Sequence, residues 1–250
     1  MRLAIDVGNT HTVYAVHDGE SWRARWRRAT SPDDTSDVVA VWLRGVFELS
    51  GLPFRVDGAS CVSVVPFLDV VLDHLCERYL NVRLLFLRSE DDHGFPIDYD
   101  PPTSLGADRI CNCLGALAKY APPILVIDFG TATKFDAVDA SGQFVGGAIM
   151  PGLRVSSQAL AEHAPRLPVV GLRPPKQAIG KNTKDALQSG IMLGYAGAVD
   201  TLARKILEEL GGGLVVATGG LGSLFLGVCE TFDTYEPMLT LDGLLAYHLR

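Results

Sequence analysis

The sequence predicts an α/β protein made of two duplicated halves, each a mixed β-sheet flanked by helices. Two observations carry this prediction. An apolar strand ends in the Asp-Val-Gly-Asn-Thr segment Asp6–Thr10, and a second apolar strand, 124–128, ends in the Asp-Phe-Gly-Thr segment Asp128–Thr131. Each of these turns is followed by strands that can fold back as hairpins and then by helical patterns. The same plan therefore occurs twice along 250 residues.

The first half predicts the order strand, strand, strand, helix, strand, helix, strand. Apolar runs and period-two alternation mark the strands, and Thr35 is a helix N-cap candidate because its hydroxyl can accept a backbone N–H. The segment 88–104, rich in Asp and Pro, is predicted to be a loop. The seven expected elements cover residues 2–7, 11–17, 22–29, 35–49, 59–65, 67–79 and 82–87.

The second half repeats the pattern of three strands followed by helices and a further strand. Ser141-Gly142 is the expected turn between the second and third strands, and Pro122-Pro123 interrupts the chain between the halves. The boundary is expected near 115–122, which gives halves of 1–118 and 119–250. The expected elements begin or lie at 124–128, 132–138, 143–149, 153, 183–210, 213–217, 221 and 239–249.

Composition excludes several classes of protein. Charged residues make up 20% of the chain and hydrophobic residues 48%, which is typical of a folded enzyme-like domain rather than a disordered segment. No apolar run reaches the roughly 18 residues of a membrane span, and no signal-peptide core is visible, so we expect a cytoplasmic protein without membrane contact. The net charge is −7, and the densest basic cluster, 23–28, alternates with apolar residues like the wet face of a strand. Nucleic-acid binding is therefore not expected.

The five cysteines lie inside apolar stretches, and their number is odd. With no Cys-x-x-Cys pair and no metal-ligand spacing to the six histidines, buried free thiols are the expected state. A structural zinc site is not expected.

The two Asp-x-Gly turns are candidates for phosphate-binding loops. A glycine lets the backbone approach an anion closely, and the N–H groups of such a turn can cradle phosphate oxygens. Asp6 would then face a phosphate-bound Mg²⁺, where a carboxylate is useful. An ordinary hairpin turn explains one such motif equally well. Two of them in equivalent places favour phosphate binding, with both loops gripping a triphosphate.

Two further segments are candidates for substrate contacts. Thr218-Gly219-Gly220 follows a strand and permits close approach of an adenine or ribose, although it also fits a plain strand–helix turn. Gly106–Arg109 begins a helix that Thr103 or Ser104 can cap, so Asp108 lies in the first turn, where the helix dipole keeps a carboxylate ionised. Asp108 could accept a hydroxyl proton and Arg109 could bind a carboxylate. Alternatively, Asp108 only complements the dipole and Arg109 is solvated.

These residues resemble the type III pantothenate kinases, within the superfamily of acetate kinase, sugar kinases, heat-shock chaperones and actin. The resemblance covers nearly the whole chain, and the combination of Gly-Ala-Asp-Arg with Asp-Phe-Gly-Thr-Ala is specific to this family. It implies two ribonuclease H-like (actin-like ATPase) halves. The matching stretches, in order, are Asp6–Thr10, Tyr99–Arg109, Asp128–Asp136, 146–147 with 151–152, Ile179–Thr183 and Thr218–Gly220.

The resemblance implies ATP-dependent phosphorylation of the primary hydroxyl of pantothenate, the first step of coenzyme A biosynthesis, by a homodimer whose pantothenate pocket lies at the subunit interface. It makes Asp108 the general base and Asp128 the ligand of a monovalent cation, K⁺ or NH₄⁺, with Mg²⁺ accompanying ATP. The implied ATP contacts are Asp6, Val7, Gly8, Asn9, Thr10, His11, Thr12, Val13 and Thr131, with Gly219 and Gly220 at the nucleoside. The implied pantothenate contacts are Tyr99, Gly106, Ala107, Asp108, Arg109 and Thr183.

Two positions depart from the family pattern. His11 stands where Asn is frequent, and Lys134 replaces a frequent Thr. Strand alternation favours an outward Lys134, although its side chain could also reach a phosphate and alter the need for the monovalent cation. Two rival functions remain: a kinase of the same superfamily that acts on a sugar or carboxylate, and a non-catalytic binding protein with the same fold. The presence of Asp6, Asp108 and Asp128 favours an active kinase.

Overall fold

The computed structural model describes residues 1–249 and divides the chain into two compact units. The first unit comprises 1–94, 100–118 and 239–250, and the second comprises 95–99 and 119–238. The units depart from the expected halves 1–118 and 119–250 in two short exchanges. As a description of duplicated halves, the boundary at 118/119 stays a prediction.

The sheet of the first unit has the strand order β3-β2-β1-β4-β5. Strands β1 to β3 form two antiparallel hairpins, and β4 and β5 continue the sheet in parallel with β1. The strands are β1 (Arg2–Val7), β2 (His11–His17), β3 (Trp22–Ala29), β4 (Gly58–Ser63) and β5 (Leu84–Phe86).

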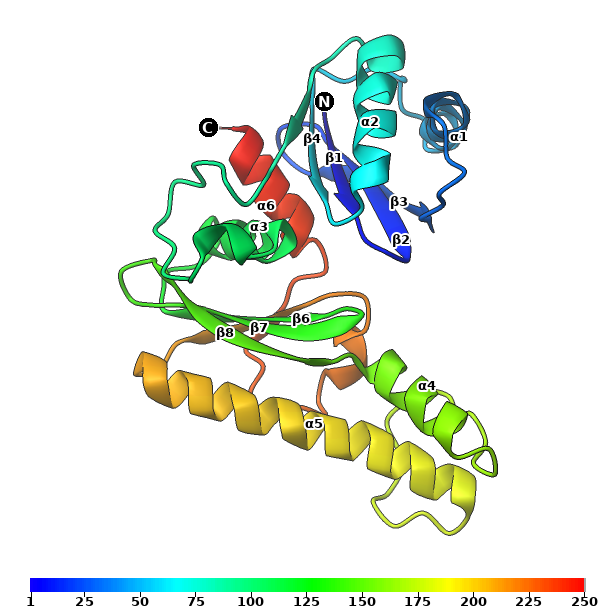
Figure 1. Cartoon of the computed structure of the whole chain (residues 1–250), viewed down its shortest axis with the longest axis vertical. Helices are drawn as coiled ribbons and strands as arrows, with labels where there is room; N and C mark the ends of the chain where they lie inside the picture. Colours follow the sequence, from blue (N-terminus) through cyan, green and yellow to red (C-terminus); the bar gives the residue numbers. More distant parts are fainter. Residues whose placement is uncertain (250) are drawn as a thin grey trace. The chain divides into compact units, whose positions relative to one another are not determined.

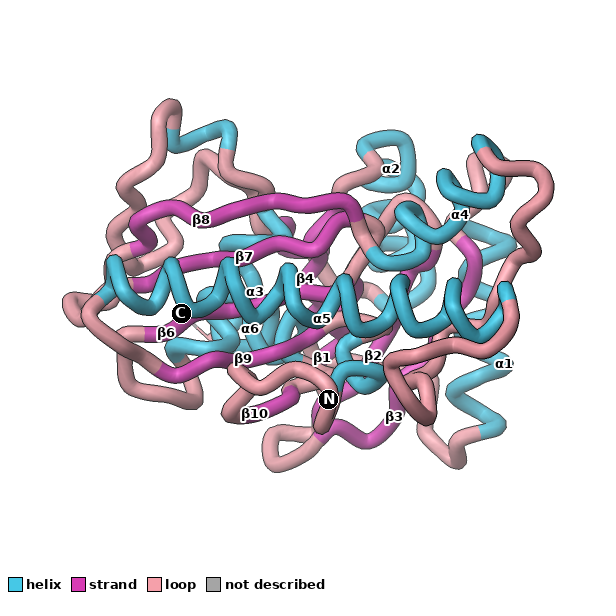
Figure 2. The backbone as a smooth tube through the Cα atoms, turned by 90° about the horizontal axis from the view of Figure 1, so that it is seen from below, coloured by secondary structure: helices cyan, strands magenta, loops and turns pink. Residues whose placement is uncertain are grey.

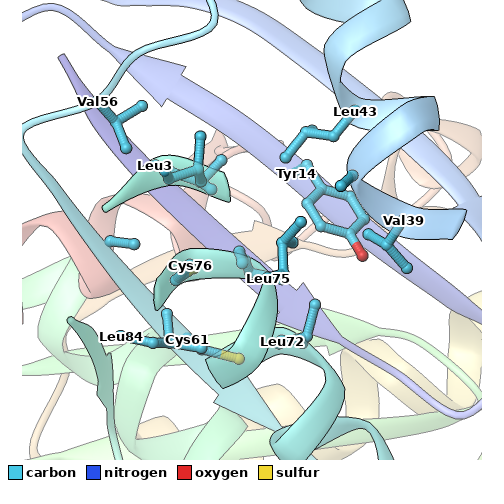
Figure 3. Close-up of a cluster of buried hydrophobic side chains, with 14 of the residues drawn as sticks. Leu3, Tyr14, Val39, Leu43, Val56, Cys61, Leu72, Leu75, Cys76 and Leu84 are labelled. Atoms are coloured by element: carbon cyan, nitrogen blue, oxygen red, sulfur yellow. The ribbon is translucent and has the colours of Figure 1, made fainter. Parts of the chain in front are cut away.

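Helices cover both faces of this sheet (Figure 1). On one face, α1 (Ser36–Leu49) and α2 (Pro66–Leu75) enclose a core with the apolar side chains of β1 and β2. Figure 3 shows Tyr14 lying between Val39 and Leu43 of α1, with Leu72 and Leu75 of α2 nearby. On the other face lie α3 (Ala107–Leu117) and α6 (Leu239–His248).

Helix α6 joins the first unit through close packing against α3. A Cβ on Gly243 would overlap the carbonyl oxygen of Cys111, so the two helices meet backbone to backbone. The Thr240 hydroxyl donates to Asn112 Oδ1 at 2.7 Å, and the Trp22 indole N–H donates to Asp242 at 2.8 Å. These contacts explain why the last helix belongs to the first unit although it follows the second along the chain.

The second unit repeats the topology. Its sheet has the order β10-β9-β6-β7-β8, in which β6, β7 and β8 are antiparallel and β9 and β10 are parallel to β6. The prediction of two hairpin-first mixed sheets is confirmed. The strands are β6 (Ile124–Phe129), β7 (Ala132–Val138), β8 (Phe144–Pro151), β9 (Leu214–Thr218) and β10 (Thr234–Tyr235).

The long helix α5 (Thr183–Leu210) lies along one face of the second sheet, and α4 (Leu153–His163) lies beside its N-terminal part (Figure 2). Phe129 and Phe135 point from the sheet into a core shared with Met192 and Val199 of α5. The Tyr195 hydroxyl donates to the Pro151 carbonyl at 2.9 Å and accepts from Thr133 at 2.7 Å, because a phenol carries one proton.

The helix expected over 67–79 is present as α2, which continues without a break into a π-helical turn, Cys76–Leu80, that Asn81 terminates at φ 54°. Three other local predictions were wrong. The helix expected from 221 is only a 3₁₀ turn, Gly222–Phe225. The cap of α3 is Gly106 rather than Thr103 or Ser104, which lie in a 3₁₀ turn of their own.

The third concerns Arg28, which does not belong to the exposed face of β3. It pairs with Asp34, and its guanidinium lies over the Trp42 ring at 5.3 Å.

All five cysteines are buried free thiols, as expected. Burial raises the pKa of Cys76 and of Cys229 to about 12, so both are neutral at physiological pH. Within residues 1–249, no helix is long and apolar enough to cross a membrane.

Candidate active site

The first candidate phosphate loop connects β1 to β2 and is anchored by Thr30, the residue that follows β3. The Thr30 hydroxyl donates to the carbonyl oxygen of Gly8 at 2.6 Å, and the Gly8 N–H donates to the His11 carbonyl at 3.1 Å. Because that bond uses the only proton of Thr30, the hydroxyl of Thr12 donates to Thr30 at 3.0 Å. Thr30 is a supporting residue that the sequence did not reveal, since nothing local connects it to Gly8.

The predicted contacts of this loop divide by burial. Asn9, Thr10 and His11 are exposed at the turn, and Gly8 and Val13 are half-buried. Val7 and Thr12 are buried, so their side chains support the loop rather than face solvent.

The predicted general base lies at the N-terminus of α3. Asp108 turns back over the helix end, and its Oδ1 accepts the backbone N–H of Arg109 at 3.0 Å. A Cβ on Gly106 would lie 2.7 Å from that oxygen, so glycine at this position leaves room for the carboxylate. Arg109 is only 5% exposed, which excludes the alternative of a solvated guanidinium.

Helix α3 brings Asp108 and Asp6 to the same region of the first unit. The Cys111 thiol, one turn along the helix, has a raised pKa, first because of burial and then because of the carboxylates of Asp6 and Asp108. Both carboxylates therefore lie within electrostatic range of one buried sulfur. That Asp6 and Asp108 lie in the same region was not predicted from the sequence.

The second candidate phosphate loop connects β6 to β7 and is one residue shorter than the first. In register, Gly130 lies opposite Ala132, whereas Gly8 lies opposite His11. Thr131 is the exposed residue at the tip. A Cβ on Gly152 would overlap the carbonyl oxygens of Gly130 and Thr131, so the Pro151-Gly152 step packs directly beneath this loop.

The Asp128 carboxylate lies between this loop and the turn after β9. A Cβ on Gly219 would lie 2.5 Å from Asp128 Oδ1, and Gly219 adopts φ +88°, a conformation that favours glycine. On its other oxygen, Oδ2, the carboxylate accepts an ion pair from Lys134 Nζ at 3.1 Å. The expectation of an outward Lys134 was therefore wrong. One part of the second unit thus contains four of the predicted site residues, namely Asp128, Thr131, Gly219 and the exposed Gly220.

Tyr99 and Thr183 occupy other parts of the second unit. Tyr99 packs edge-on against Phe144 at 5.7 Å, next to a β-bridge between Ile97 and Phe144. Thr183 opens α5 after the N-cap Asn182. It lies twelve residues before Tyr195, which contacts β7, so about 18 Å of helix separates it from that contact at 1.5 Å per residue.

Thr183 lines an apolar groove of about 900 Å³ between α4 and α5. Its lining includes four leucines and one isoleucine, among them Leu153, Leu160 and Ile191, together with small residues of both helices. The sequence did not predict this groove, because it arises only where the two helices meet.

The strand order and pairing of the two sheets are those of the actin-like fold, which sugar kinases share. With 99% of the chain covered, the structure aligns at a TM-score of 0.60 and 16% identity with a putative 2-dehydro-3-deoxygalactonokinase from Sinorhizobium meliloti, of which 96% is covered. It aligns at 0.53 and 12% identity with a ROK hexokinase from Thermus thermophilus, with 99% of this chain and 97% of that one covered. At sequence identities this low, the structural similarity shows a shared fold alone.

Sequence similarity defines the family within that fold. The family model of the type III pantothenate kinases matches residues 2–205. A type III pantothenate kinase from Acidiphilium cryptum is 43% identical over 252 aligned positions, with 100% of this chain and 95% of the relative covered. A second, from Paramagnetospirillum magneticum, is 44% identical, with 100% and 97% covered. The chain belongs to the type III pantothenate kinase family and is an enzyme of the kinase class.

Proposed function

We propose that this enzyme transfers the γ-phosphoryl group of ATP to the primary hydroxyl of pantothenate, giving 4′-phosphopantothenate and ADP. Membership of the family indicates that pantothenate is the substrate. The observation that best supports the reaction is the position of Asp108, whose carboxylate lies at a helix N-terminus where Gly106 leaves room for it.

In the proposed step, the pantothenate hydroxyl oxygen attacks the γ-phosphorus while the bond to the β,γ-bridging oxygen breaks. The hydroxyl proton passes to Asp108, and ADP leaves with the bridging oxygen. Asp108 need not deprotonate the alcohol in advance, because phosphoryl transfer depends mainly on alignment and charge neutralisation. The buried guanidinium of Arg109 is assigned to the carboxylate of pantothenate, with Tyr99 and Thr183 as further contacts.

The two loops are assigned to ATP. The exposed turn Asn9–His11 and the tip residue Thr131 offer N–H and hydroxyl groups to phosphate oxygens, and Gly219 and Gly220 let the nucleoside approach the backbone. Asp6 is the carboxylate assigned to Mg²⁺. Residues 1–249 contain no cluster of three or more His, Cys, Asp or Glu side chains suited to a metal, which fits a Mg²⁺ held by one or two carboxylates together with phosphates and water. Bound there, Mg²⁺ would neutralise charge on the phosphates.

We also propose a homodimer that uses the groove between α4 and α5. This surface is apolar, and Ile179, which is 78% exposed, directly precedes Gly180, one of its lining residues. Contiguous apolar surface of this kind is typical of protein contacts. Because Thr183 lies at one end of the groove and about 18 Å of helix from the β7 contact, its assigned role in binding pantothenate fits a pocket completed by a second copy.

The test is to mix purified protein with ATP, Mg²⁺ and pantothenate and to follow phosphopantothenate by mass spectrometry and ADP by a coupled assay. Asp108→Asn preserves size and removes the proton acceptor, so kcat should fall by about 10² to 10⁴. A panel of sugars and carboxylates in the same assay tests the rival substrates. Absence of product from the parent protein, or full activity in Asp108→Asn, contradicts the proposal.

A further inference from the structure

Lys134 and Asp128 form an ion pair inside the second phosphate loop. The two residues are directly opposite in the antiparallel pair of β6 and β7, and Lys134 Nζ lies 3.1 Å from Asp128 Oδ2. Each side chain is only 16% exposed. Partial burial weakens solvent screening, so this pair is held more firmly than a surface ion pair.

Strand alternation explains why Lys134 points toward the loop. Thr133 and Phe135 face α5, through the Tyr195 hydroxyl and the core respectively. Because successive side chains of a strand point to opposite faces, Lys134 lies on the other face of the sheet. Asp128 lies on that same face, since its neighbour Phe129 points into the core with α5. The sequence suggested that Lys134 points outward to solvent. In the structure, the face of the sheet that carries Lys134 also carries the Asp128 carboxylate.

The surroundings of Asp128 leave little freedom for its carboxylate. Oδ1 lies against the backbone of Gly219, and Oδ2 is paired with Lys134. The backbone of Gly130 is close as well, since a Cβ there would lie 3.9 Å from Oδ1 and 4.0 Å from Oδ2.

The equivalent position of the first loop carries no charge. Asp6 is the counterpart of Asp128, and its cross-strand partner is Val13. The ammonium is therefore a feature of the second loop alone, which is the loop whose carboxylate would hold K⁺ or NH₄⁺.

The residues present do not fit a monovalent cation at Asp128. Such an ion needs several oxygen ligands, and one oxygen of Asp128 already accepts an ammonium. A second positive charge a few ångströms from Lys134 Nζ would be repelled in a partly buried site, where opposite and like charges interact more strongly than in water. An alkylammonium also has the same charge as NH₄⁺ and donates the same kind of hydrogen bond.

We propose that the ammonium of Lys134 supplies the single positive charge beside Asp128 that K⁺ or NH₄⁺ would otherwise supply, so that this enzyme uses ATP without a monovalent cation. The expected effect on kinetics rests on the proposed function. The neutralisation of the Asp128 carboxylate by the Lys134 ammonium rests on the geometry of the loop alone.

The kinetic experiment compares kcat/KM for ATP in KCl, NH₄Cl and choline chloride at equal ionic strength. The parent enzyme should change by less than about twofold among the three salts. Lys134→Thr, which introduces a β-branched residue that suits a strand and offers a hydroxyl oxygen, should lose more than about tenfold in choline chloride and recover in KCl or NH₄Cl. Lys134→Met, which fills the space without a charge, should be slow in all three.

Lys205→Met is the matched control. Lys205 is exposed on α5, so this variant loses the same formal charge away from the loop and should behave like the parent in every salt. It separates an effect of net charge from an effect at Asp128.

A second readout does not depend on turnover. The thermal midpoint of each protein is measured in KCl and in choline chloride, with and without ADP and Mg²⁺. The parent, Lys134→Met and Lys205→Met should show no K⁺-specific shift, whereas Lys134→Thr should be stabilised by K⁺ because the vacated carboxylate can bind it.

Each outcome decides the inference. A parent enzyme that K⁺ accelerates more than tenfold or stabilises specifically overturns it, and so does a Lys134→Thr variant that is insensitive to K⁺ in both readouts. If Lys134→Thr does not fold, the salt dependence of the parent still decides. If the parent phosphorylates no pantothenate in any salt, the proposed function fails, and the thermal readout then decides the cation question separately.

Discussion

Replacing Gly106 by Ala should move the proposed base without unfolding the protein. The added Cβ would lie 2.7 Å from Asp108 Oδ1, whereas ordinary contact begins at 3.4 Å, so the carboxylate must withdraw by about 0.7 Å. The atom that must move is the end of a side chain, and Gly106 has φ −59°, which alanine adopts freely.

This substitution should change the stability of the protein little and its kcat much more. Loss of the bond from the Arg109 N–H to Asp108 costs about 1 kcal/mol. The reduced entropy of the unfolded chain returns about 0.4–1 kcal/mol. Stability should therefore change by no more than about 1 kcal/mol. A displacement approaching 1 Å in a catalytic group costs on the order of 100-fold, so kcat should fall between about 10- and 100-fold.

The assay combines steady-state kinetics with urea unfolding of the same preparation. Gly45→Ala is the control, because Gly45 lies inside α1 with nothing within 4 Å of an added Cβ. It should stabilise the protein by about 0.5–1 kcal/mol and leave kcat unchanged. A Gly106→Ala enzyme with the kcat of the parent would refute the reasoning, as would a loss of activity that only follows a loss of folded protein.

Three further outcomes are expected. In Gly152→Ala the added Cβ meets the carbonyl oxygens of Gly130 and Thr131, so the second loop must shift. Urea unfolding should show that the free energy of unfolding falls by about 1–3 kcal/mol. Steady-state kinetics should show a higher KM for ATP. Gly243→Ala should separate α6 from α3 and lower the thermal midpoint by more than Gly45→Ala raises it. Burial lowers the pKa of His248 from its usual 6.5, so the unfolded chain binds the proton more readily than the folded protein does. The free energy of unfolding should therefore fall as the pH drops from about 7 to about 5. Urea titrations at several pH values should show that His248→Gln flattens this slope. A steeper or unchanged slope in that variant, or unaltered stability in either glycine variant, would contradict these expectations.

The succession of strands and helices along the chain could be predicted from the sequence because its signals are local. Each half begins with an apolar strand, an Asp-x-Gly turn and a hairpin, and these patterns depend on residues that are near one another in the chain. The predicted limits of β1, β2, β3 and β7 agree with the structure. The catalytic candidates Asp6, Asp108 and Asp128 were also visible, since each lies within a short motif whose residue types suit phosphate chemistry.

Partners distant along the chain escaped prediction. Thr30 holds Gly8 from 22 residues away, and α6 packs on α3 through Gly243 and Cys111. A helix of ten residues with apolar residues on several sides can pack on any exposed apolar surface, so only the close backbone contact with α3 decides its place. The cap of α3 was predicted wrongly for a local reason, because Thr103 and Ser104 lie in a 3₁₀ turn that ends before the helix begins.

By itself, the sequence determined that this protein has two hairpin-first α/β sheets with an Asp-x-Gly turn after the first strand of each, because short-range periodicity and turn chemistry suffice for such elements. Only the tertiary structure decided the direction of Lys134. Alternation places a strand residue on one of two faces, but it does not say which face carries the site. The register of β6 against β7 places Lys134 opposite Asp128, and that pairing turns an apparent surface lysine into the positive charge of the second loop.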